Sequence, residues 1–227
     1  MADFVIKPTT GNLKIQDDQD VDRIVIAPTT GVTTLSNPTL TAPTIANMAN
    51  CTFPAGHVIQ VQYTQLDEYK EMSNIANTTQ YVLQHSSSPS TSLGTAGVLQ
   101  VAITPKSSSK IRIDVGCCGE CDPDVVYPWA WFIVRDSTAI ISSQTSGYNS
   151  GIFPSSRAHH ASDADSTMDN TYFSYFDANH GGDGSTSITY KLGFRQSGAV
   201  GTFHINRTKT ANNTYGMSFI SATEISG

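Results

Sequence analysis

Apolar and polar residues alternate along much of the chain after residue 53. The stretch 111–115 (IRIDV) is apolar at every second position, and 58–63, 81–85 and 98–103 show the same period. A period of two is typical of a strand with one buried face. The run 129–134 (WAWFIV) is apolar throughout, which predicts a central strand. Further strands are expected at 139–142, 171–176, 187–195, 202–206 and 218–224.

These segments predict an all-β domain. About ten short strands separated by turn residues are typical of a sandwich or a barrel. One short helix is expected, within 66–77. The composition agrees, because only 14% of the residues are charged and helix surfaces are normally rich in Glu, Lys and Arg. Two polar loops, 86–97 and 143–170, are long enough to carry contacts with partners.

The N-terminal part contains an internal repeat. Residues 5–11 (VIKPTTG) return as 25–31 (VIAPTTG), and a short alternating stretch follows each copy, at 12–15 and at 32–35. Each unit predicts a strand, a Pro-Thr-Thr-Gly turn and a second strand. One hairpin buries too little apolar surface to be stable alone, so the repeats must lie against neighbours or a partner. The attachment residues are expected to be Val5, Ile6, Pro8, Gly11, Val25, Ile26, Pro28 and Gly31.

The chain therefore divides into an arm, a linker and a larger domain. We assign residues 1–36 to a repeated β-hairpin attachment arm and residues 55–227 to a C-terminal β-sandwich domain. Residues 37–54 contain three prolines and show neither a helical nor a strand period. They predict an extended linker rich in Pro and Thr.

Charge and the first residues exclude several classes of protein. The net charge is −6 and no basic cluster is present, so we expect no nucleic-acid partner. Residues 1–8 (MADFVIKP) lack the order of a signal peptide, and no apolar run approaches the roughly 20 residues that cross a membrane. We therefore expect a protein that is made in a cytosol, stays soluble and has no membrane partner.

Three of the four cysteines lie within the stretch 116–122 (GCCGECD). This clustering is unlike the spread of cysteines in a disulfide framework. Cys118 and Cys121 form a C-x-x-C pair, but zinc needs four such ligands, so Cys51, Cys117 or a histidine would have to join. A redox pair would stand at a helix N-terminus, whereas this one follows a predicted strand. We expect a tight loop between two strands and keep Cys118 and Cys121 as candidate metal ligands.

Two further stretches could hold a cation. The stretch 177–188 begins like an EF-hand calcium loop, but Gly181 and Ile188 stand where that loop needs an oxygen ligand and a glutamate. A glycine-rich hairpin turn is the expected structure there. The loop 143–170 holds a polar cluster that could bind a cation at a subunit junction or remain solvated, and no cofactor is expected. Its residues are His159, His160, Asp163, Asp165 and Asp169.

The sequence carries no recognised catalytic motif, so we expect a protein that is not an enzyme. The Gly-x-Ser-x-Gly motif of serine hydrolases is absent. A small polysaccharide hydrolase or esterase remains the alternative, because two facing carboxylates cannot be excluded from sequence. The aromatic stretch 172–176 (YFSYF) could stack against sugars. Its two faces are both bulky, which favours a buried strand in a sandwich or trimer core.

The C-terminal part resembles small virion proteins of tailed bacteriophages, particularly those that infect marine bacteria and cyanobacteria. Residues 187–195 (SITYKLGFR) precede a turn and 202–207 (TFHINR), and the last strand, 214–225, ends in Glu-Ile. The stretch 53–61 (FPAGHVIQV) is also similar to theirs. The resemblance covers mainly residues 53–65 and 171–227.

This resemblance implies a jelly-roll-like or tumour-necrosis-factor-like β-sandwich, usually a homotrimer, on the exterior of the virion and made in the bacterial cytoplasm. Such domains occur in capsid decoration (cement) proteins, head fibres and tail-fibre tips. We expect a trimeric decoration or head-fibre protein that docks through its arm and stabilises the shell. Its partners would be its own copies, the major capsid protein or other virion proteins, and a host surface glycan. The alternative is a tail-fibre or receptor-binding protein that contacts the host through its long loops.

Overall fold

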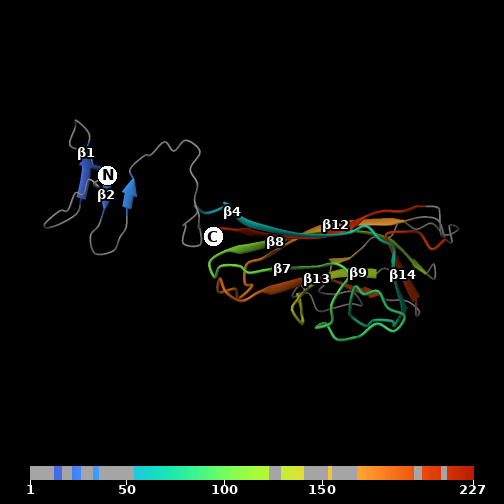
Figure 1. Cartoon of the computed structure of the whole chain (residues 1–227). Helices are drawn as coiled ribbons and strands as arrows, with labels where there is room; N and C mark the ends of the chain where they lie inside the picture. The colour runs from blue at the N-terminus through green and yellow to red at the C-terminus, as the bar shows by residue number, and fades with distance from the viewer. Residues whose placement is uncertain are drawn as a thin grey trace, which may run out of the picture. The chain divides into compact units, whose positions relative to one another are not determined.

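The structure is a computed structural model in which part of the chain is described (Figure 1). The chain divides into two compact units, Met1–Cys51 and Thr52–Gly227. The predicted linker, 37–54, lies outside the described residues apart from Pro54. The backbone alone is described for Asp122 and for the short strands β1, β2, β3 and β11. Side chains are described for residues 54–121, 129–140, 168–196, 201–210 and 214–227.

The first unit contains a three-stranded antiparallel sheet. Its strands are β1 (Leu13–Gln16), β2 (Asp22–Ile26) and β3 (Thr33–Leu35), with β2 in the middle. Leu13 and Thr33 occupy equivalent positions of the two sequence repeats, and both pair with Ile26, one on each edge of β2. The two repeats thus place matching strands on either side of a shared one.

The second unit is a β-sandwich of two antiparallel sheets (Figure 1). The described residues include no helix, and so none that could cross a membrane. One sheet consists of β4 (Val58–Leu66), β5 (Lys70–Ile75), β8 (Lys110–Asp122), β12 (Asp169–Asp177), β14 (Gly201–Ile205) and β15 (Ser218–Ile225). The other consists of β6 (Tyr81–Val82), β7 (Gln100–Ile103), β9 (Trp129–Arg135), β10 (Thr138–Ile140), β11 (Phe153–Pro154) and β13 (Ile188–Gln196).

The strands are connected in the order of a jelly roll. The first two strands of the domain, β4 and β5, pair with the last two, β15 and β14. Closer to the middle of the sequence, β6 and β7 pair with β13, and β8 pairs with β12. The innermost pair is β9 with β10 and β11. This nesting of first with last is the double-sheet jelly roll that the resemblance implied.

The core lies between the two sheets, and β9 supplies its largest side chains. Trp131 lies edge-on to Phe194 of β13 and Phe203 of β14, with ring centroids 5.1 Å and 5.4 Å away. Its indole N–H donates to the hydroxyl of Thr171 at 3.1 Å, so the buried ring also has a polar partner. The prediction that 129–134 forms a central strand is confirmed, since β9 runs between β10 and β13 and is buried.

Three local predictions were wrong. The segment 66–77 contains strand β5 and no helix, because β5 pairs with β14 and this tertiary contact decides the backbone. Residues 117–121 lie inside the long strand β8, where a loop between two strands was expected. The segment 178–187 is no hairpin turn, because it connects β12 and β13, which belong to different sheets.

The loop 86–97 is held against the outer surface of the sheet that contains β9. Leu93 packs on a small apolar cluster that includes Phe132 of β9. The ammonium group of Lys191 donates to the carbonyl oxygens of Leu93, at 2.8 Å, and of Thr95, at 3.1 Å. This polar loop is therefore anchored by both apolar and charged contacts.

Candidate interaction surface

The outer surface of the sheet β12-β8-β15-β4 carries an ordered array of side chains. Residues paired directly across neighbouring strands share one face of a sheet, so the strand register fixes this array. We call the array the aromatic face. Its three rows are Tyr172, Gly116, Phe219 and Gln65; Ser174, Asp114, Ser221 and Tyr63; and Phe176, Arg112, Thr223 and Val61.

Gly116 makes room for the rings of the first row. A Cβ atom at this position would lie 2.4 Å from the ring of Phe219 and 2.7 Å from that of Tyr172. The two ring centroids are 6.2 Å apart, and Phe219 in turn stacks on Tyr63 at 5.8 Å. Glycine inside a strand often marks such a close approach. Here it allows a line of three rings to run across β12, β15 and β4.

The second and third rows place an ion pair among these rings. Arg112 contacts Oδ1 of Asp114 at 2.9 Å through Nη2, and the hydroxyl of Ser174 donates to the same oxygen. The arginine side chain is 47% exposed, so this pair contributes little to stability in water. A shallow pocket of about 370 Å³ is lined by Asp114 of this pair and by Tyr172 and Phe219. The centre of the aromatic face thus combines rings with mutually neutralised charges.

Large apolar side chains of the aromatic face are exposed. Tyr172 is 72% exposed, Tyr63 and Val61 are each 55% exposed, and Phe176 is 54% exposed. Contiguous apolar surface of this kind marks interaction sites on soluble proteins. The alternation predicted for 172–176 is confirmed, because every second side chain of β12 points outward. The described part of this chain does not cover the outward side chains of Tyr172 and Phe176, which are exposed.

Asp177, the last residue of β12, joins the two sheets of the sandwich. Its Oδ2 accepts hydrogen bonds from Arg135 of β9 and from the hydroxyl of Tyr190 of β13, at 2.8 Å and 2.9 Å. Arg135 also donates to the carbonyl oxygen of Asn179 at 2.8 Å. Burial and the nearby Asp177 carboxylate raise the pKa of Tyr190. This carboxylate, the first of the calcium-loop-like stretch, is thus committed to structural contacts.

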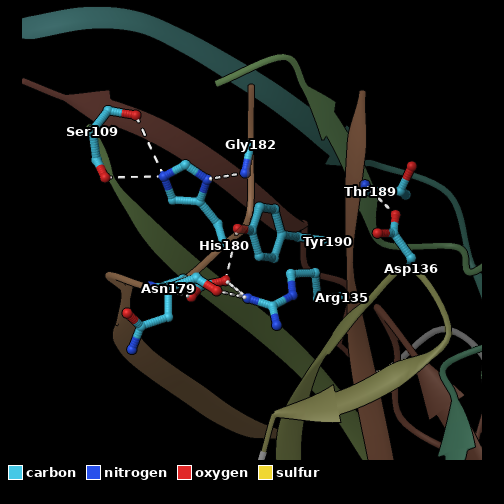
Figure 2. A network of polar contacts seen from close by, with 9 residues as sticks. Ser109, Arg135, Asp136, Asn179, His180, Gly182, Thr189 and Tyr190 are labelled. Atoms are coloured by element: carbon cyan, nitrogen blue, oxygen red, sulfur yellow. Dashed lines mark hydrogen bonds and ion pairs between the residues drawn. The ribbon is translucent and has the colours of Figure 1, made fainter. Parts of the chain in front are cut away.

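The rest of the loop 178–187 is fixed by its own polar groups. The backbone N–H of Gly182 donates to Nδ1 of His180 at 2.9 Å, and Nε2 of His180 lies 2.9 Å from the carbonyl oxygen of Ser109 (Figure 2). The backbone N–H groups of Thr186 and Ser185 donate to Asp183 and hold the pKa of its carboxyl well below its usual range. The connection is therefore held by hydrogen bonds to its own side chains and to Ser109, the residue before β8.

The two cysteines of the C-x-x-C pair point to opposite faces of β8. They are three residues apart in a strand whose pairing continues without a bulge, and successive side chains of a strand alternate. Cys121 lies in the core, whereas Sγ of Cys118 donates to Oδ1 of Asn206 at 3.4 Å. The pair therefore cannot bind one ion together. Among the described residues, no group of three or more His, Cys, Asp and Glu side chains suits a metal, and His159, His160 and Asp163 lie outside those residues.

Thiol reagents are expected to leave Cys117, Cys118 and Cys121 unmodified in the folded protein. All three are buried and form no disulfide bond, and burial raises the pKa of the Cys117 and Cys118 thiols, so little thiolate forms near pH 8. The measurement is a colorimetric thiol count on a Cys51→Ser variant, with and without denaturant. We expect no fast-reacting thiol in the native state and three after unfolding. Rapid native labelling of any of them would contradict the buried placement of β8.

A polar cluster that the sequence did not indicate surrounds His204 of β14. Strand register places Glu120 of β8 on one side of it and Glu71 of β5 on the other. Nδ1 of His204 lies 3.0 Å from the hydroxyl of Tyr69, and the guanidinium of Arg207 lies 3.4 Å above the Tyr69 ring. Burial and a hydrogen bond to Glu71 raise the pKa of Tyr69 to about 12. The cluster combines residues from three distant parts of the chain, 69–71, 120 and 204–207, so no local motif could have revealed it.

The attachment residues fall partly within the described strands. Val25 and Ile26 lie in β2, the central strand of the first unit. Their side chains, and the predicted attachment residues Val5, Ile6, Pro8, Gly11, Pro28 and Gly31, lie outside the described part of the structure. Their role therefore stays a prediction.

Fold and surface together define an all-β jelly-roll protein with an exposed aromatic sheet face and a separate N-terminal unit built from a sequence repeat. A comparison of the sequence with models of protein families and with curated proteins finds no match.

Proposed function

We propose that this chain is a structural protein of a bacteriophage particle: a trimeric capsid decoration or head-fibre protein without catalytic activity. In this proposal the N-terminal unit docks on the shell, and the jelly roll stands on the exterior of the virion. The observation that carries the proposal is the combination of two separate units in one chain, a small sheet built from repeats and a sandwich with an exposed apolar face.

The small sheet supports an attachment role. Its outer strands, β1 and β3, each pair with β2 on one side, and the described strands provide no partner on the other. A free strand edge can take up a further strand from another chain. The major capsid protein, another virion protein or a neighbouring copy of the arm could supply that strand. Docking of this kind would bridge neighbouring subunits and stabilise the shell.

The aromatic face supports trimer formation. Closed homo-oligomers bury matching surfaces of their subunits. Tyr172, Phe219 and Tyr63 form a line of rings that water solvates poorly, and the Arg112–Asp114 pair at its centre carries no net charge. Three copies that meet through this face would bury these rings while keeping the paired charges hydrogen-bonded.

A tail-fibre or receptor-binding protein is the second candidate. The observation that favours it is the anchored loop 86–97, which presents several exposed Ser and Thr side chains on a fixed support. Binding loops are typically carried in this way by a rigid scaffold. The aromatic face would serve the same trimer in either case.

The position and copy number of the protein in the particle distinguish the two functions. We expect cryo-electron microscopy and immunogold labelling of purified virions to place many copies on the head. Density or label confined to the tail, at a few copies, would favour the receptor-binding protein. Absence from purified virions would reject both proposals.

A further inference from the structure

A pocket of about 450 Å³ opens on the sheet opposite to the aromatic face. This volume lies within the roughly 300 to 1,000 Å³ that is usual for small-molecule sites. Four segments meet around it: the anchored loop 86–97, strand β7, the turn between β9 and β10, and the start of β13. Its lining residues are Gly94, Ala96, Gln100, Asp136, Ser137, Thr189 and Lys191.

Lys191 provides a positive charge whose position is fixed. Two of its N–H groups are directed to the carbonyl oxygens of Leu93 and Thr95. An ammonium group has three N–H donors, so one remains for an oxygen atom in the pocket. Gln100 fixes the same wall, because its side-chain oxygen accepts the backbone N–H of Gly97 at 2.9 Å. The loop wall of the pocket is thus formed before any ligand enters.

Asp136 provides the opposite charge on the rim. Its backbone has a positive φ of 55°, which brings its side chain back over β13. There Oδ1 accepts the backbone N–H of Thr189 at 2.9 Å (Figure 2). The described residues place no second donor on this carboxylate, so Oδ2 can accept hydrogen bonds from a ligand. The hydroxyl groups of Ser137 and Thr189 can both donate and accept.

We propose that this pocket binds one neutral hexose unit of a glycan. Its two charges cancel, and the remaining lining residues, Gly94, Ala96, Gln100, Ser137 and Thr189, are uncharged. Sugar hydroxyls both donate and accept, so they can bind the Asp136 carboxylate and the Lys191 ammonium at once. An anionic sugar would meet the Asp136 carboxylate and a chain of net charge −6, which disfavours it.

The binding of a single hexose is expected to be weak, with a Kd on the order of 1 mM, because the lining offers no aromatic ring for stacking. A trimer built on the aromatic face would leave one such pocket open on each subunit. Several weak sites that engage one polysaccharide together can give strong adhesion. In the proposed virion protein, this pocket would bind a glycan as its target. Sugar binding can be measured on the purified chain, so the test does not depend on where the protein lies in the particle.

The test is a nuclear magnetic resonance titration of the isotope-labelled full chain. The probes are methyl α-D-glucopyranoside, methyl α-D-mannopyranoside and methyl β-D-galactopyranoside, with N-acetylneuraminic acid as the anionic probe. We expect at least one hexoside at about 10 mM, tenfold above the expected Kd, to shift the amide signals of Ala96, Ser137 and Thr189. Asp136→Asn should weaken binding about tenfold or more, because it removes a charged acceptor. Asparagine tolerates a positive φ, so the turn should be retained.

Two more variants keep the result unambiguous. Ala96→Phe should fill the pocket and abolish the shifts. Glu68→Gln removes another exposed carboxylate, one that does not line the pocket, and this variant should bind like the unchanged protein. Absence of shifts with all three hexosides overturns the proposal. Binding of N-acetylneuraminic acid alone overturns the neutral assignment, and shifts that survive Ala96→Phe overturn the location.

Discussion

Replacing Tyr172 with glutamate is expected to convert the proposed trimer into monomers. Tyr172 is 72% exposed in the isolated chain and begins the line of rings on the aromatic face. Central aromatic residues dominate the energy of protein interfaces, and losing one typically costs about 2 kcal/mol or more. The new carboxylate would in addition be buried without a partner, since Arg112 already contacts Asp114. Light scattering coupled to size-exclusion chromatography at micromolar concentration measures the mass directly.

The control for this experiment introduces the same charge elsewhere. Thr138→Glu places a carboxylate on an exposed position of β10, in the opposite sheet, and should leave the trimer unchanged. If the Tyr172→Glu protein stays trimeric, the aromatic face is not the interface. If the unchanged protein is already a monomer at these concentrations, trimer formation through this face is ruled out.

Replacing Asp177 with alanine is expected to destabilise the sandwich by about 3 kcal/mol, because removing one member of a buried ion pair leaves the other uncompensated. The Asp177 side chain is only 4% exposed, and its loss would leave both Arg135 and the buried hydroxyl of Tyr190 without this acceptor. Urea denaturation followed by tryptophan fluorescence measures the change. Asp177→Asn keeps an acceptor oxygen and should lose less. Asp183→Ala, at an exposed position of the loop that follows β12, should have a much smaller effect, and an equal loss would contradict the bridging role of Asp177.

Much of the sandwich could be predicted from residue periodicity. The alternation in 111–115 and 218–224 corresponds to β8 and β15, whose inward side chains form the core. These strands are long and lie inside their sheet, so burial imposes a clear period on their sequences. β5 could not be found in this way, because its sequence (KEMSNI) alternates poorly and its pairing with β14 forms it.

The loop expected around the cysteines was wrong. The stretch contains Gly116 and Gly119, and glycine usually marks a turn. In the structure both lie within β8, at points where a side chain would collide with a neighbour. The relevant information is the shape of residues far away in the sequence, such as Phe203 and Phe219, which a local pattern does not contain.

The candidate sites were less predictable than the fold. The alternation in 172–176 could be predicted from the sequence, but the exposure of its side chains could not. That exposure depends on β12 being an outer strand of its sheet. The pocket near Asp136 and the cluster around His204 are assembled from segments separated by dozens of positions in the chain. Strand register brings such residues together, and register follows from the completed sandwich.

The first and last strands of the sandwich domain are joined by hydrogen bonds at the point where the chain enters the domain. The backbone N–H of Gly56 donates to the carbonyl oxygen of Ser226 at 2.8 Å, and that of Ser226 donates to His57 at 2.8 Å, so β4 begins beside the end of β15 (Figure 1). Tension that reaches the sandwich through residue 54 would run along β4. Hydrogen bonds of an antiparallel ladder stand perpendicular to the strands. Such a load would shear the whole β4–β15 ladder at once instead of breaking its hydrogen bonds one by one.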